Sequence, residues 1–263
     1  MEHKQLGQTG VMLPEIGLGT WMYRGGTGPI RRAVELGAFH IDTAEVYGTE
    51  DTVGEAIEDI RGRVFVATKV SPSHFRRKDL VQAAENSLKR LRTDHIDLYQ
   101  LHWPSSEVPI AETMGVMEEL VDAGKVRSIG VSNFSVEQVV EAQAVLSRHR
   151  IVSNQVRYSL ADRGIESRLI PYCQSAGITV IAYSPLARGL SMLKASDRSG
   201  ALARVASEAR RTEAQVALNW CIRREGVVAI PKANSVAHVE ENCGASGWSL
   251  SDEQARALEE AFR

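Results

Sequence analysis

Short runs of β-branched and other apolar residues alternate along this chain with longer segments in which apolar residues recur every three or four positions. The short runs predict buried strands, and the wider spacing predicts helices that bury one face. One such helix carries Leu80, Ala84, Leu88 and Leu91. Strands are expected at residues 15–20, 40–42, 64–68, 96–101, 128–131, 152–156, 179–182 and 227–230.

Local start signals support this division into helices. Ser135 with Gln138, and Ser251 with Gln254, match the capping-box pattern, in which two side chains satisfy free backbone N–H groups at a helix start. The longest irregular stretch runs from Leu186 to Gly200, and its glycines, serines and basic residues predict a surface loop, either an ordered one or one that closes over a ligand.

Eight strands that alternate with helices allow either a doubly wound sheet or a closed barrel, and the number eight favours the barrel. The expected fold class is therefore α/β, a (β/α)8 TIM barrel formed by residues 1–263 as a single domain. His3 to Val11, with a turn at Gln8-Thr9-Gly10, predict a small β-hairpin that caps the barrel floor. The early glycines do not follow the GxGxxG order of a Rossmann fold, so a dinucleotide would bind in another way.

Composition and charge narrow the expected partners and compartment. Apolar residues make up 43% of the 263 residues and charged residues 24%, which is typical of a globular protein. A balance of 31 basic against 33 acidic side chains gives a formal charge of −2, so neither nucleic acid nor an anionic membrane is an expected partner. The three cysteines follow no metal-binding spacing, and no long apolar run occurs. We therefore expect a protein of the reducing cytoplasm. We expect it to have no metal site, disulfide framework, signal peptide or membrane span.

Polar residues follow the ends of three consecutive predicted strands: Asp42, Tyr47, Lys69 and His102. In a (β/α)8 barrel the C-terminal strand ends form the active site, so these side chains are expected to converge. A phenol becomes a better proton relay near neutral pH when a cation such as Lys69 lies beside it. Asp42 would keep the buried ammonium charged, and His102 would orient a carbonyl oxygen.

Each of these residues also has a purely structural interpretation. Asp42 can cap a turn, and Lys69 can extend its ammonium into solvent. Tyr47 can pack with its hydroxyl in water, and His102 can be a hydrogen-bonded core histidine. A Schiff-base aldolase also places a lysine at a barrel strand end, so Lys69 alone does not decide the reaction. The combination with Asp42 and Tyr47 favours a reductase.

Longer motifs occur in order along nearly the whole chain. They are Gly17–Trp21, His40–Ala44 with Tyr47-Gly48, Leu101–Pro104, Gly130–Phe134, Ala182–Leu186, Pro231-Lys232 and Glu241-Asn242. This series resembles the aldo-keto reductase superfamily. The resemblance implies an NAD(P)H-dependent reductase that converts aldehydes or ketones to alcohols by hydride transfer from a nicotinamide. It also implies that the four strand-end residues are the catalytic tetrad, with Tyr47 as the general acid.

The same resemblance assigns cofactor-binding residues in the second half of the chain. They are Ser132, Asn133, Gln155, Tyr183, Ser184, Leu186, Lys232, His238, Glu241 and Asn242. The first three would hold the nicotinamide carboxamide, the tyrosine would stack on its ring, and the next two would contact the pyrophosphate, with Arg188 or Lys194 adding charge. Without the resemblance, a turn would explain Ser132-Asn133 and core packing would explain Tyr183.

The segment that grips the adenosine 2′-phosphate in the family departs from its usual pattern here. The family often has Pro-Lys-Ser followed by an arginine, whereas this chain has Pro231-Lys232-Ala233 with His238 at the arginine position. Lys232 remains as a point charge, but the always-charged bidentate arginine is lost, with Ser235 or Asn234 left to compensate. NADPH is therefore the expected preferred cofactor, with measurable use of NADH.

Aromatic side chains are expected to form the substrate pocket. Trp21 and Trp103 would line its mouth beside Tyr47, while Trp220 and Trp248 would be packing residues. Short loops predict an open pocket for small aldehydes, dicarbonyls or keto sugars. A cofactor-sensing regulatory subunit with slow turnover is the alternative, although no partner-binding extension is visible. The chain is expected to be a monomer or a weak homo-oligomer.

Overall fold

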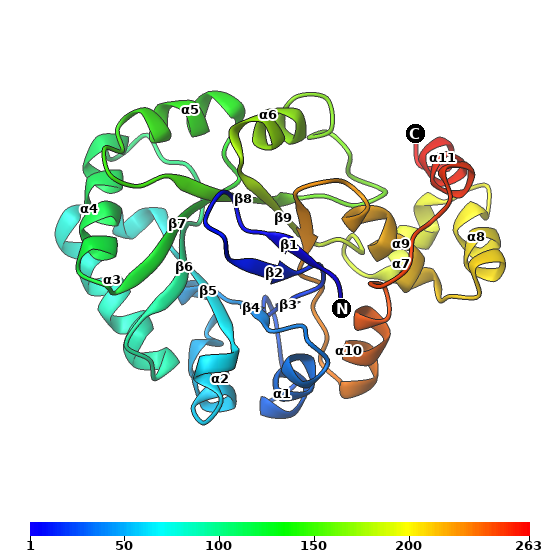
Figure 1. Cartoon of the computed structure of the whole chain (residues 1–263), viewed down its shortest axis with the longest axis horizontal. Coiled ribbons are helices and arrows are strands. Elements are labelled where there is room, and N and C mark those ends of the chain that lie inside the picture. Colours follow the sequence, from blue (N-terminus) through cyan, green and yellow to red (C-terminus); the bar gives the residue numbers. More distant parts are fainter.

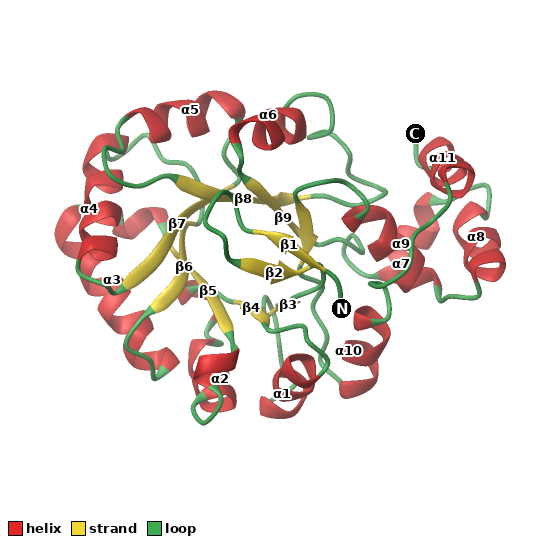
Figure 2. Ribbon diagram, viewed as in Figure 1, coloured by secondary structure: helices red, strands yellow, loops and turns green.

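The computed structural model describes residues 1–263 and contains a ring of parallel strands surrounded by helices (Figure 1, Figure 2). The strands of the ring are β3 (Leu18–Gly19), β4 (His40–Asp42), β5 (Phe65–Val70), β6 (Ile96–Leu101), β7 (Val126–Ser132), β8 (Ile151–Arg157), β9 (Thr179–Tyr183) and β10 (Val227–Ala229). They pair in chain order. The ring closes because Gly17 N–H donates to the Ala229 carbonyl and Ala229 N–H to the Glu15 carbonyl, both at 2.8 Å. The fold is the expected α/β (β/α)8 barrel.

The first strand is shorter than the predicted range 15–20, since only Leu18–Gly19 forms a regular ladder with β4. Its glycines allow the close approach that closing the ring requires. A Cβ atom at Gly17 would lie 2.6 Å from the His40 carbonyl oxygen, and one at Gly19 would lie 2.7 Å from the Ile230 carbonyl oxygen. Any larger side chain at these positions would push the neighbouring strands apart.

The α-helices pack on the outside of the ring. They are α1 (Thr27–Glu35), α2 (Glu50–Ile57), α3 (Arg77–Leu91), α4 (Ile110–Asp122), α5 (Val136–Ala144), α6 (Leu169–Ala176), α7 (Leu190–Ser196), α8 (Ala201–Ala209), α9 (Glu213–Ile222), α10 (Val236–Cys243) and α11 (Asp252–Ala261). Capping boxes start α5 and α11 as predicted, and a third, Thr212 with Gln215, starts α9. None of the helices is both long and apolar enough to cross a bilayer.

The prediction of an irregular stretch from Leu186 to Gly200 is wrong in part, because α7 lies inside it. This helix has no side-chain cap, so the sequence carries no local start signal for it. Its one fully buried residue, Leu193, packs into the main hydrophobic core. Leu190 of the same helix is half-buried and also packs against that core, so tertiary packing stabilises a helix that local patterns do not reveal.

An antiparallel hairpin crosses the middle of the ring, as Figure 1 shows for β1 and β2. It consists of β1 (His3–Gln5) and β2 (Met12–Pro14), so its second strand begins just beyond the predicted limit at Val11. The turn is wider than expected, because Leu6 N–H donates to the Val11 carbonyl at 2.8 Å.

The hairpin covers the N-terminal end of the barrel. Leu6 and Leu13 are fully buried and plug the inside of the floor. Thr179, the first residue of β9, donates its hydroxyl hydrogen to the Gln5 carbonyl at 2.9 Å and accepts from Gly7 N–H at 2.8 Å. The hairpin therefore does not cover the opposite end of the barrel, where the C-terminal ends of the strands lie.

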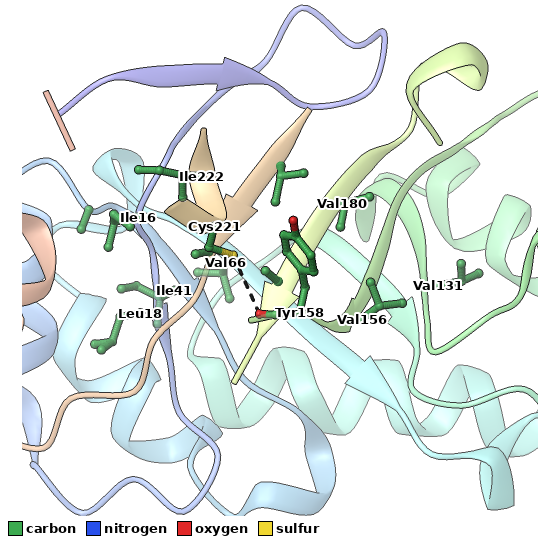
Figure 3. Close-up of a cluster of buried hydrophobic side chains, with 14 of the residues drawn as sticks. Ile16, Leu18, Ile41, Val66, Val131, Val156, Tyr158, Val180, Cys221 and Ile222 are labelled. Carbon is green, nitrogen blue, oxygen red and sulfur yellow. Dashed lines mark hydrogen bonds between the residues drawn. The ribbon is translucent and has the colours of Figure 1, made fainter. Parts of the chain in front are cut away.

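Alternation along the strands separates apolar from polar side chains. Figure 3 shows a part of the main core, which includes outward-facing residues of several strands: Ile41, Val66, Val131, Val156 and Val180. These residues pack against the surrounding helices. The intervening positions point into the ring. Towards the C-terminal strand ends, several of these inward positions carry polar side chains, and they form the site described next.

Candidate active site

The four residues predicted to form the tetrad come together at the C-terminal ends of neighbouring strands. Asp42 ends β4, Lys69 lies near the end of β5, and His102 follows β6. Tyr47 is the last residue of a short 3-10 helix, η1 (Glu45–Tyr47), directly after β4. The helix brings the phenol back over the strand ends.

Lys69 is fully buried at the centre of this group. Its Nζ donates to Asp42 Oδ1 at 2.6 Å and to the Thr43 carbonyl oxygen at 2.8 Å. It also lies 4.9 Å from the centroid of the Tyr47 ring. Burial lowers the pKa of Lys69, but interactions led by the Asp42 carboxylate outweigh burial and leave that pKa above its ordinary value. Lys69 is therefore a buried cation with a specific counterion.

Tyr47 places its hydroxyl 3.3 Å from His102 Nε2, and the two rings meet edge to face with centroids 5.4 Å apart. Burial raises the pKa of Tyr47, while the charge of Lys69 lowers it. The expected influence of the lysine is present, but burial outweighs it and the pKa remains above its ordinary value. Tyr47 therefore keeps its proton at neutral pH, as a proton donor must.

His102 is nearly buried and is neutral at physiological pH. Burial lowers its pKa to about 4, and the nearby Lys69 cation adds to that decrease. A neutral imidazole can form one hydrogen bond through each ring nitrogen without bringing a second positive charge into the site. His102 is thus suited to orient an oxygen atom rather than to carry charge.

The second carboxylate oxygen of Asp42 accepts hydrogen bonds from two glutamines. Gln155 Nε2 lies 2.7 Å from Asp42 Oδ2, and Gln100 Nε2 lies 3.4 Å from it. Gln155 was assigned to the nicotinamide carboxamide by family resemblance, but here its amide N–H group bonds to Asp42. Gln100 was not singled out in the sequence. Its signal is a polar residue at an inward position of the otherwise apolar inner face of β6, where Leu98 precedes it.

Asn133 joins the tetrad to the neighbouring strand ends. Its Nδ2 donates to the His102 carbonyl at 3.2 Å and to Ser132 Oγ at 3.0 Å, and its Oδ1 accepts from the Tyr183 hydroxyl at 3.0 Å. The Ser132 hydroxyl donates to the Gln155 carbonyl at 2.9 Å. The predicted nicotinamide-binding residues therefore form one hydrogen-bonded group beside the tetrad.

The positions predicted to contact the pyrophosphate lie in the turn after β9. Ser184 has a left-handed backbone with φ of 49°, and both Ser184 and Leu186 are half-buried. Of the two cations considered for this region, Lys194 pairs with Glu213 at 2.7 Å, whereas Arg188 is exposed. Arg188 is the cation that remains available to an anionic ligand.

The predicted 2′-phosphate segment lies between β10 and α10. Lys232 is exposed there, beside the N-terminus of α10. Ser235 and Asn234, the residues expected to compensate for the missing arginine, already form hydrogen bonds within the protein. Ser235 Oγ accepts from His238 N–H at 3.3 Å, and Asn234 Oδ1 accepts from Arg24 N–H at 3.0 Å. The remaining predicted positions lie further along α10, Glu241 half-buried and Asn242 buried.

Apolar side chains are exposed at the mouth of the barrel. Trp21, after β3, is 56% exposed, and Trp103, after β6, is 49% exposed. Met22, next to Trp21 in the chain, and Val46, next to Tyr47, are similarly exposed, and sequence reasoning missed both. Trp220 is almost completely buried, in agreement with its expected packing role.

Comparison with known proteins assigns the family. The family model for the Aldo/keto reductase family matches residues 15–263. The chain is 38% identical over 274 residues to the methylglyoxal reductase YeaE of Escherichia coli, covering 100% of this chain and 96% of that protein. This chain belongs to the aldo/keto reductase family.

Solved structures agree with this assignment. The thermostable aldo-keto reductase Tm1743, in complex with the inhibitor epalrestat, matches with a TM-score of 0.93 at 41% identity, covering 99% of this chain and 100% of that chain. An aldo/keto reductase from Klebsiella pneumoniae in complex with NADP and acetate matches with a TM-score of 0.88 at 39% identity, covering 99% and 95%.

Proposed function

We propose that this chain binds NADPH and reduces aldehydes and ketones to alcohols, with Tyr47 as the proton donor. The observation that carries the proposal is the placement of the Tyr47 hydroxyl, 3.3 Å from His102 Nε2 and beside the ammonium that Asp42 holds at 2.6 Å. A protonated phenol between a buried cation and a neutral imidazole is suited to protonate an oxygen that gains negative charge. The similarity to a methylglyoxal reductase and to an NADP complex supports the same reaction.

The residues around the tetrad fit a nicotinamide nucleotide. Asn133 Oδ1 accepts from the Tyr183 hydroxyl and keeps a second lone pair for an amide N–H, and the half-buried ring of Tyr183 offers an aromatic face, as a flat neutral carboxamide requires. The exposed Arg188 and Lys232, on the loops after β9 and β10, offer positive charge for phosphates. Bound there, the nicotinamide would supply the hydride.

Each tetrad residue then has a separate task. Neutral His102 donates a hydrogen bond that orients the substrate carbonyl oxygen towards Tyr47. Tyr47 gives its proton to that oxygen as the carbonyl carbon is reduced. Lys69 stabilises the phenolate that Tyr47 becomes, and Asp42 keeps Lys69 in place.

A Schiff-base aldolase is not favoured by the surroundings of Lys69. An imine-forming lysine must present a neutral, reachable amine. Here the amine is fully buried, its hydrogens are directed to Asp42 and the Thr43 carbonyl, and its pKa is raised, chiefly by the Asp42 carboxylate, despite burial. Borohydride is therefore expected to trap no carbonyl compound on Lys69.

Small aldehydes, dicarbonyls and keto sugars are the proposed substrates. The exposed Trp21, Val46 and Trp103 provide apolar contact at the mouth without directional hydrogen bonds. A pocket without buried polar groups aimed at one substrate discriminates weakly among carbonyl compounds. Broad activity with modest affinity is expected.

The experiment that tests this function follows NADPH absorbance with methylglyoxal and 4-nitrobenzaldehyde as substrates. Tyr47→Phe should lower kcat at least about a hundredfold, because the general acid is lost while the ring remains. Tyr172→Phe, a change to a half-buried tyrosine of α6, is the matched control and should keep wild-type activity. Equal activity of wild type and Tyr47→Phe, or an inert wild type, would overturn the proposal.

Cofactor preference is tested at Lys232. We propose that NADPH is preferred and NADH is used measurably, because Lys232 supplies charge to the 2′-phosphate while His238 replaces the usual arginine. Lys232→Met should lower kcat/KM for NADPH about tenfold and leave kcat/KM for NADH unchanged. Equal efficiency of the wild type with both cofactors would contradict the preference.

A further inference from the structure

The Asp42 carboxylate is held on both of its oxygens. Oδ1 accepts from Lys69 at 2.6 Å, while Oδ2 accepts from Gln155 at 2.7 Å and from Gln100 at 3.4 Å. We propose that Gln100 is a positioning residue of the reductase site, which together with Gln155 orients Asp42 so that Lys69 stays beside Tyr47. The inference rests on the proposed function.

The amide of Gln100 lowers the stability of the fold locally. Gln100 is fully buried, and its carbonyl oxygen Oε1 has no hydrogen-bond partner. A buried oxygen without a partner costs stability, whereas a leucine of similar volume would carry no such cost. Leu98 occupies the preceding inward position of the same strand. The contact with Asp42 is the only hydrogen bond that the Gln100 side chain makes, and it explains why an amide stands here.

The neighbouring strand is shaped around Gln100. Gly130 of β7 lies opposite Gln100 in the parallel register. A Cβ atom at Gly130 would lie 2.9 Å from Gln100 Cγ and 2.5 Å from Ser153 Oγ. Contacts this short are not tolerated, so the glycine provides the space in which the Gln100 side chain reaches Asp42.

The chemistry of an amide suits this task. Its N–H groups donate to a carboxylate but do not transfer a proton to it, so Asp42 stays an acceptor for Lys69. Without Gln100 the carboxylate has fewer restraints on its orientation, and Lys69 is held less closely to Tyr47. Lys69 lowers the pKa of Tyr47 against the effect of burial. Weaker placement of the cation therefore makes Tyr47 a weaker acid.

The test variant is Gln100→Leu. We expect kcat to fall about tenfold with an unchanged KM for NADPH, because the proton-transfer step is affected and cofactor binding is not. The solvent deuterium isotope effect on kcat should increase, and the basic limb of the pH profile should move to higher pH as the pKa of Tyr47 rises. The melting temperature should stay equal or increase, because an unsatisfied buried oxygen is removed.

Tyr99→Phe is the matched control on the same strand. Tyr99 is fully buried, its hydroxyl has no partner, and its ring belongs to the main core rather than to the barrel interior. The control also removes a buried oxygen that has no hydrogen-bond partner, and it should leave kcat and the isotope effect unchanged. If Gln100→Leu also shows wild-type kcat, isotope effect and pH profile in an active enzyme, the positioning role is refuted and the proposed function stands. An inert wild type refutes both.

If Gln100→Leu melts well below the wild type, Gln100→Met takes its place with the same expectations. A loss of kcat in both variants that merely follows a loss of folded protein also overturns the proposal, because it assigns Gln100 a structural role.

Discussion

Asn133 contributes to the site through both its backbone conformation and its side-chain hydrogen bonds. It has φ of 63°, in the left-handed region that asparagine tolerates better than most residues. Its amide group bonds to the His102 carbonyl and accepts from the Tyr183 hydroxyl. One residue therefore ties the ring expected to stack on the nicotinamide to the proposed catalytic histidine, His102, directly after β6.

Two substitutions separate these contributions. Asn133→Ala loses the hydrogen bonds and strains the backbone, and should lower the free energy of unfolding by about 3 kcal/mol. Asn133→Gly loses the same bonds but tolerates positive φ, so we expect it to be more stable than the alanine variant by about 1 kcal/mol. Urea denaturation measures both values. Equal stability of the two variants would contradict the backbone part of this explanation.

At the scale of elements, Lys4 connects the hairpin to the end of α9 and the start of β10. Its Nζ donates to the carbonyl oxygens of Ile222, Arg224 and Val227, the last two at 3.0 and 2.9 Å. It also pairs with Glu15 at 3.5 Å. A single side chain thus satisfies backbone carbonyls that a helix end leaves without partners.

Replacing Lys4 by methionine keeps the apolar stem and removes these bonds. We expect Lys4→Met to lower the free energy of unfolding by about 2–3 kcal/mol, because several partly buried carbonyls lose their donor. Its kcat should equal that of the wild type, since the hairpin lies at the end of the barrel away from Tyr47. Lys78→Met, at an exposed position of α3, is the control and should change neither quantity. If Lys4→Met had a reduced kcat and unchanged stability, the hairpin end of the barrel would influence the end that holds Tyr47, in contradiction to this prediction.

At the scale of the whole molecule, two buried histidines link stability to pH. His40 has no partner for either ring nitrogen, and burial lowers its pKa to about 4. Burial also lowers the pKa of His102 to about 4. In the unfolded chain both titrate near their ordinary pKa of about 6.5. Between these values the unfolded state binds protons that the native state does not, so falling pH favours unfolding.

The contribution of these two histidines to the free energy of unfolding should therefore be constant above about pH 6.5. It should decrease as the pH falls towards about 4. His40 alone accounts for about 3 kcal/mol of that loss. His40→Phe should remove this share while leaving the His102 share, and urea unfolding at both ends of the pH window measures it. An unchanged pH dependence in His40→Phe would show that His40 is not responsible.

We also propose that residues 1–263 unfold as one domain. The two ends of the chain depend on each other, because Ala229 closes the ring with Glu15 and Gly17, and Glu2 N–H donates to Ser246 Oγ at 2.8 Å. Differential scanning calorimetry should show one transition with equal calorimetric and van't Hoff enthalpies. Two separable transitions would divide the chain into domains.

The sequence by itself determined features that depend on near neighbours in the chain. The strand positions followed from short apolar runs, and the starts of α5 and α11 followed from side chains three residues apart. The position of Asp42, Lys69 and His102 at successive strand ends followed from the same runs, because every parallel strand of a barrel presents its C-terminal end to one face. Such features are repeated or local, so one chain is enough to recognise them.

Only the tertiary structure decided how these residues act on one another. The strand register brings Gln100 and Gln155 to the same oxygen of Asp42, although they lie on different strands far apart in sequence. The net rise in the pKa of Tyr47 also depends on burial, which the sequence does not specify. Hydrogen bonds and desolvation vary over distances of an ångström or less, and only the closed ring brings distant residues to such distances.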